Sequence, residues 1–172
     1  MILEESGCKM YTVDDLDRVL ERFDLPLACT GAPYPVVLSD ESNAAVAYVT
    51  QKGWNDPART VPLYAIILFI DYFSYMFGQP DGEAFSVHPL YARGLEPYSF
   101  SEVVHSSWIR QLTEMNSVHH RRTDALYKDC RHFILSFHDS TFECIAQEYA
   151  CILFEGSEAE AIGRMRERFA KT

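Results

Sequence analysis

The stretch that decides the fold is RHFILSFHDSTFECIAQEYACILF, which runs from Arg131 to Phe154. It contains two apolar runs, and the short segment from His138 to Thr141 separates them. Asp and Ser are turn formers, because their side chains hydrogen-bond nearby backbone groups. Asp139 and Ser140 therefore predict a β-hairpin, and the second run is long enough for its strand to continue beyond the hairpin.

Side chains alternate along a strand, so this hairpin has two faces. With the turn centred on Asp139 and Ser140, one face is apolar and consists of Phe133, Leu135, Phe137, Phe142, Cys144 and Ala146. The other face is mostly polar and pairs His138 with Thr141, Ser136 with Glu143, Ile134 with Ile145 and His132 with Gln147. A slip of one residue would mix the two sets, so the pattern favours this assignment of faces.

Periodicity predicts further elements before and after the hairpin. Strands are expected at 36–38, 45–50 and 63–77, with a short strand at 84–87; the run at 63–77 is apolar on both faces, as is typical of a central strand. Helices are expected over 12–23, from a capping box at Ser99 to Asn116, and after a capping box at Ser157. The short turns between strands indicate antiparallel pairing. The sequence therefore predicts a single α+β domain over residues 1–172, mainly an antiparallel sheet with three helices packed on it.

Composition limits the classes of function. The chain has 172 residues, 48% of them hydrophobic, and a net charge of −10 with a pI near 5.0. An acidic surface disfavours binding to nucleic acid and to anionic membranes. The five cysteines show no C-x-x-C spacing and the N-terminus lacks the features of a signal peptide, so we expect reduced thiols and a cytoplasmic protein.

The polar face of the hairpin is the first candidate site. It brings together His132, Ser136, His138 and Glu143, with Asp139 at the turn. A histidine beside a carboxylate can act as a base with its orienting group, or as part of a metal site. The alternative is an ordinary solvated sheet face, which is common in antiparallel sheets.

Asp71 is the second candidate, because it interrupts the apolar run at 63–77. A buried carboxylate must be paired or must shift its pKa upward, and either condition can mark a functional site. The alternative is a structural carboxylate that is hydrogen-bonded to a neighbour.

His119 to Arg122 form the third candidate, a basic island on an acidic chain. It could bind a phosphate or an acidic partner segment. The alternative is a set of cations that stabilise the C-terminal end of the preceding helix. His105 is expected to be a surface residue.

The sequence contains no phosphate-binding glycine loop, no G-x-S-x-G and no H-E-x-x-H, so no metal or cofactor is expected. The leading hypothesis is a cytoplasmic binding or interaction protein, with a second copy or another protein as its partner and no small-molecule ligand identified. The alternatives are a small metal-assisted or hydrolytic enzyme that uses the polar face of the hairpin, and an acidic immunity-type inhibitor of a basic toxin. A concave pocket over that face favours the enzyme, whereas a flat or covered face favours the binding protein.

Overall fold

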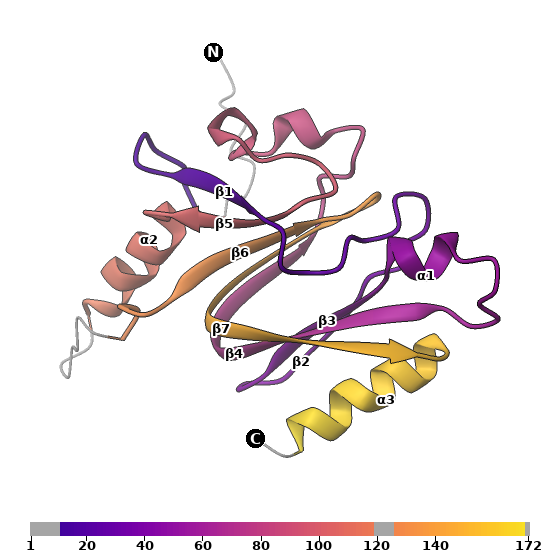
Figure 1. The fold of residues 1–172 in the computed structure, drawn as a ribbon. Helices are drawn as coiled ribbons and strands as arrows, with labels where there is room; N and C mark the ends of the chain where they lie inside the picture. The colour runs from indigo at the N-terminus through magenta and orange to yellow at the C-terminus, as the bar shows by residue number, and fades with distance from the viewer. Residues whose placement is uncertain (1–10, 119–125, 171–172) are drawn as a thin grey trace, which may run out of the picture.

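Figure 1 shows the fold in a computed structural model, which describes residues 11–118 and 126–170. Seven antiparallel strands form one sheet in the order β1-β5-β6-β7-β4-β3-β2. The strands are β1 (Arg18–Arg22), β2 (Val36–Ser39), β3 (Ala44–Val49), β4 (Leu63–Gly78), β5 (Phe100–Val104), β6 (Arg131–Ser136) and β7 (Thr141–Glu155). The helices are α1 (Gln51–Asn55), α2 (Ser107–Asn116) and α3 (Glu158–Phe169), with 3-10 turns η1 (Phe85–Val87) and η2 (Tyr91–Arg93). The described residues thus contain the expected antiparallel sheet and three α-helices, of which α1 lies where no helix was predicted.

The predicted hairpin is formed by β6 and β7, but its register differs from the prediction. Ser136 lies opposite Thr141 and His132 lies opposite Ile145, instead of Glu143 and Gln147. The turn lies one residue earlier than expected, at His138 and Asp139, and the N–H of Phe137 donates to the carbonyl of Ser140 across it at 2.8 Å. Because the register differs by an even number of residues, the two predicted faces keep their members.

The sheet is strongly curled, and the apolar face of the hairpin lies inside the curl. The rings of Tyr48 in β3 and Phe137 beside β6 are 5.3 Å apart. In the sheet order these strands are separated by β4 and β7, which in a flat sheet would hold them about 14 Å apart. The long strands β4 and β7 bend together to bring them face to face (Figure 1).

Two apolar clusters cover the outer face of the curled sheet. One lies under α2 and the η1–η2 segment, and includes Trp108, Leu90 and Ile134. The other lies under α3, whose Ala161 and Met165 pack on the sheet. His132, Ile134, Glu143 and Ile145 of the predicted polar face are buried in this first region, so the alternative of an ordinary solvated sheet face is wrong for this part of the hairpin.

Asp71 lies where β4 bends. Its φ is 48°, in the left-handed region that Asp tolerates better than most residues, and the register with β7 shifts between Tyr72 and Ser74. Before this point Phe69 packs inside the curl, and after it Tyr72 does. The prediction that side chains alternate without interruption through 63–77 would place Tyr72 on the same face as Ile66. It is therefore wrong beyond the bend.

The helix predicted over 12–23 is wrong. Arg18 to Arg22 form β1, which pairs with β5, and Leu20 is 50% exposed and Phe23 80% exposed. The apolar spacing fits a helix, but strand pairing and the buried carboxylate of Asp17 decide the conformation.

The other helix predictions are confirmed in part. The helix predicted from Ser99 exists but begins after Ser106, because residues 100–104 form β5 and pair with β1 and β6. The capping box of Ser157 and Glu160 opens α3 as predicted. Residues 85–87 form a 3-10 turn instead of a strand.

No helix in residues 11–118 and 126–170 combines the length and apolar character of a membrane span. The cysteines at 29, 130, 144 and 151 are free, and Cys8 lies outside the described residues. The basic island from His119 to Arg122 also lies outside them.

Candidate functional site

The residues predicted for the polar hairpin face separate into three places. His132 and Glu143 meet in a buried cluster. Ser136 is buried elsewhere, where its hydroxyl accepts the N–H of Ser99 at 2.8 Å. His138 and Asp139 lie at the tip of the hairpin, where Nδ1 of His138 is 2.6 Å from the carboxylate of Asp139 and Asp139 is exposed.

Glu143 is the centre of the cluster and accepts hydrogen bonds from three side chains. The donors are the hydroxyl of Tyr11 at 2.6 Å, Nε2 of His132 at 2.8 Å and Nε2 of His88 at 3.2 Å. Burial by itself would raise the pKa of Glu143, but the hydrogen bonds from His132 and His88 outweigh burial and lower this pKa to about 2. Glu143 is therefore an ionised carboxylate inside the protein. Burial and the charge of Glu143 in turn raise the pKa of Tyr11, so its phenol remains a donor.

The tautomer of His88 follows from its second contact. Its Nδ1 accepts the backbone N–H of Leu90 at 3.1 Å, so Nδ1 carries no proton and Nε2–H donates to Glu143. A metal bound at Nε2 would require the opposite tautomer, with a proton on Nδ1 facing the N–H of Leu90. The cluster as arranged therefore does not suit a metal, and no group of three or more His, Cys, Asp or Glu among the described residues forms a metal-binding set.

Ser106 extends the cluster to the start of α2. Its hydroxyl lies 2.9 Å from Nδ1 of His132 and also accepts the N–H of Ile109 at 3.3 Å as the N-cap of the helix. Because the N-cap bond uses the hydroxyl as an acceptor, its own proton is available to Nδ1 of His132. Ser106, His132 and Glu143 thus follow the order of nucleophile, base and orienting carboxylate in serine hydrolases. His105, whose φ is 55°, makes the sharp turn from β5 into α2.

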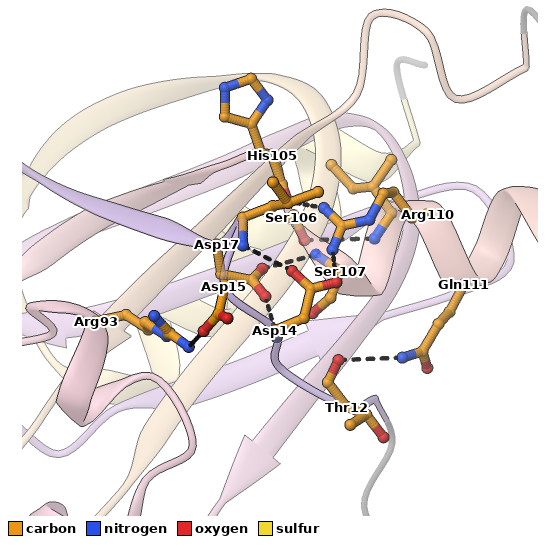
Figure 2. Close-up of polar contacts among 12 residues, drawn as sticks. Thr12, Asp14, Asp15, Asp17, Arg93, His105, Ser106, Ser107, Arg110 and Gln111 are labelled. Atoms are coloured by element: carbon orange, nitrogen blue, oxygen red, sulfur yellow. Dashed lines mark hydrogen bonds and ion pairs between the residues drawn. The ribbon is translucent and has the colours of Figure 1, made fainter.

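Residues 11–17, here named the N-terminal strap, cover this region from outside (Figure 2). The carboxylate of Asp17 accepts the N–H of Ser107 at 2.7 Å, which satisfies a free amide at the start of α2. Asp14 forms an ion pair with Arg110, and the side chain of Gln111 donates to the carbonyl of Thr12 at 3.3 Å. His105, by contrast, points away from these contacts and is exposed, as predicted (Figure 2).

The cluster is closed to solvent. Tyr11 stacks on Trp108 with ring centroids 5.3 Å apart, and His132 meets both rings edge-on. Exposure is 0% for His132, 4% for Ser106 and 7% for Glu143. The polar face of the hairpin is therefore covered by other segments of the same chain. A substrate would reach it only after the strap or α2 had moved.

Asp71 does not lie in this cluster and is exposed, so the prediction of a buried carboxylate is wrong. It lines a hollow of about 450 Å³ between the β2–β3 turn, the bend of β4 and the end of α3. The lining also includes Leu68, Ile70 and Phe169.

Sequence reasoning missed Tyr11, the contact of His88 with Glu143 and the role of Ser106. Each lies far along the chain from Glu143 or His132 and reaches the cluster only through the fold. The one local signal was the polar run from His105 to Ser107, which precedes an apolar helical stripe.

Comparisons of this chain with family models, with curated proteins and with solved structures find no match.

Proposed function

We propose that this chain is a non-enzymatic binding protein. The observation that carries the proposal is the closure of the cluster around Glu143: the groups best suited to acid–base chemistry are buried, and they hydrogen-bond to one another. A catalytic base must reach the proton that it removes, and His132 is 0% exposed. The cluster instead joins the N-terminal strap, the segment before η2 and the hairpin.

The accessible concave surface has the character of a binding site. The hollow beside Asp71 is lined by apolar side chains and a few polar groups, as ligand pockets commonly are. The hypothesis of an acidic inhibitor of a basic toxin remains a prediction from net charge alone.

The proposal is tested by assaying purified protein against activated esters, amides, phosphate esters and glycosides. We expect no turnover above that of a His132→Gln variant. Turnover that the wild-type protein shows and this variant lacks would contradict the proposal.

A serine hydrolase is the second candidate, because hydrogen bonds join Ser106 to His132 and His132 to Glu143. This is the order of nucleophile, base and carboxylate in such enzymes. In that reaction Oγ of Ser106 attacks the carbonyl carbon of an ester or amide while its proton passes to Nδ1 of His132, and Nε2–H keeps its hydrogen bond to Glu143. Nδ1 then gives the proton to the alcohol or amine as the bond between this leaving group and the carbonyl carbon breaks. Water, which loses a proton to the same Nδ1, attacks the acyl group, and the proton returns to Oγ of Ser106 as the acid is released. A fluorophosphonate probe distinguishes the two candidates, since it labels activated serines: labelling that disappears in Ser106→Ala supports the hydrolase.

A further inference from the structure

Three segments meet around the hollow beside Asp71: the β2–β3 turn, the bend shared by β4 and β7, and the C-terminal end of α3. Figure 1 shows them converging in the lower part of the view. The hollow has a volume of about 450 Å³, within the range of about 300–1,000 Å³ that small-molecule sites occupy.

Part of the lining is apolar surface left open to water. Ile70 lies in β4, a central strand of the sheet, just before its bend, and is nevertheless 44% exposed. Leu68 and Phe169 line the same hollow and are only partly buried. An apolar ligand that covered these side chains would gain free energy in proportion to the apolar area removed from water.

Asp71 supplies the charge. Among the described residues its carboxylate has no hydrogen bond or ion pair. Its negative charge contributes to raising the pKa of Cys130 to about 11, but burial and the charge of Asp129 contribute more. Its φ of 48° and the irregularity between Tyr72 and Ser74 set the direction of its side chain at the bend, as bulges near binding sites commonly do.

The charges around the hollow determine the class of ligand. The chain carries a net charge of −10, which raises the local concentration of cations near its surface. Arg168 also lines the hollow and disfavours a ligand with a second positive charge. We infer that this hollow binds a small organic monocation, an ammonium group on an apolar body, with the ammonium on Asp71 and the apolar body on Ile70 and Phe169. This inference rests on the proposed binding function.

Isothermal titration calorimetry with phenethylamine as the probe tests the inference. The wild-type chain of 172 residues should bind it saturably, with a Kd of about 1 mM or below. Asp71→Asn should weaken binding at least about tenfold, since it removes a charge-assisted hydrogen bond, and asparagine also tolerates a positive φ. Ile70→Ser should weaken binding as well. The carboxylate analogue 3-phenylpropionate and the diamine cadaverine should bind more weakly than phenethylamine.

Asp139→Asn is the matched control, because it makes the same change at the exposed tip of the hairpin and should leave the affinity unchanged. Equal affinity of wild type and Asp71→Asn, or no saturable binding at about 10 mM probe, would overturn the inference. Absence of amine binding without catalytic turnover overturns the inference alone. Turnover that depends on Ser106 overturns the proposed binding function, whether or not amines bind.

Discussion

Replacing Glu143 by glutamine tests whether the closed cluster holds the fold together. The substitution keeps the size of the side chain but removes its charge and turns one acceptor oxygen into an NH2 donor. Tyr11, His88 and His132 all donate to this carboxylate. The tautomer of His88 is fixed by Leu90, so at least one of the three donors would face another donor or lose its partner.

The expected loss follows from these contacts. A hydrogen bond to a charged group contributes about 1.5–3 kcal/mol, against about 1 kcal/mol for a neutral one, and a buried donor that loses its partner costs about 1–3 kcal/mol. We therefore expect Glu143→Gln to lower the free energy of unfolding by about 2–4 kcal/mol. Tyr11→Phe removes one donor and leaves the other two, so it should cost about 1.5–3 kcal/mol.

Urea denaturation followed by tryptophan fluorescence measures both losses, since Trp108 lies in the same cluster. Glu148→Gln is the matched control: it makes the same change in the same strand at an exposed position and should cost within about 0.5 kcal/mol. A loss below about 1 kcal/mol for Glu143→Gln would refute the reasoning, because it would mean that the carboxylate contributes little to holding the three segments.

Four further predictions concern pH, the core and the surface. Folding lowers the pKa of Glu143 from an ordinary 4.5 to about 2. The contribution of Glu143 to stability is therefore fully present above its pKa in the unfolded chain and is lost as pH falls through its pKa in the folded protein. Urea melts at pH values between these two pKa values should show a shallower pH dependence for Glu143→Gln than for wild type. Trp108→Ala should cost about 3–5 kcal/mol, since Trp108 is 2% exposed, and an unchanged melting temperature would contradict its place in the core. Asp71→Gly should be neutral or stabilising by up to about 1 kcal/mol, whereas Asp71→Val should cost about 1–2 kcal/mol, as the left-handed conformation requires; equal stabilities would exclude strain at this position. His138→Ala should cost within about 0.5 kcal/mol in the same assay, and a larger loss would show that the hairpin tip is packed.

The two faces of the hairpin were predictable because side chains alternate along a strand. An error of an even number of residues in the register leaves every side chain on its predicted face. The exact position of the turn was not predictable, because the polar residues from His138 to Ser140 fit a turn centred on Asp139 and Ser140 as well as the observed one at His138 and Asp139. The helix predicted over 12–23 failed for a related reason: Leu16, Leu20 and Phe23 have helical spacing, but no local signal shows that β5 offers Arg18 to Arg22 a partner strand. Pairing with a distant strand outweighs local propensity.

The candidate site was predictable only in part. The alternation placed His132 and Glu143 on one face, and they do meet. Whether that face is exposed to solvent or buried depends on Tyr11, His88 and Trp108, which lie far from the hairpin along the chain. Asp71 was selected as an interruption in an apolar run, and the structure gives that interruption a different cause: it lies at the bend, where the backbone turns the strand.

A buried carboxylate is stable only where donors replace the water that it loses. The donors to Glu143 come from the N-terminal strap, from the segment before η2 and from the hairpin itself, so the carboxylate is fully satisfied only when all three segments are in place. Apolar contacts between the same segments tolerate small shifts, whereas hydrogen bonds between 2.6 and 3.2 Å do not. Glu143 should therefore fix the relative position of these segments as well as stabilise them. Hydrogen exchange in Glu143→Gln should therefore increase in the strap and in residues 85–95 before it increases in β3, whose buried residues belong to the other two apolar clusters.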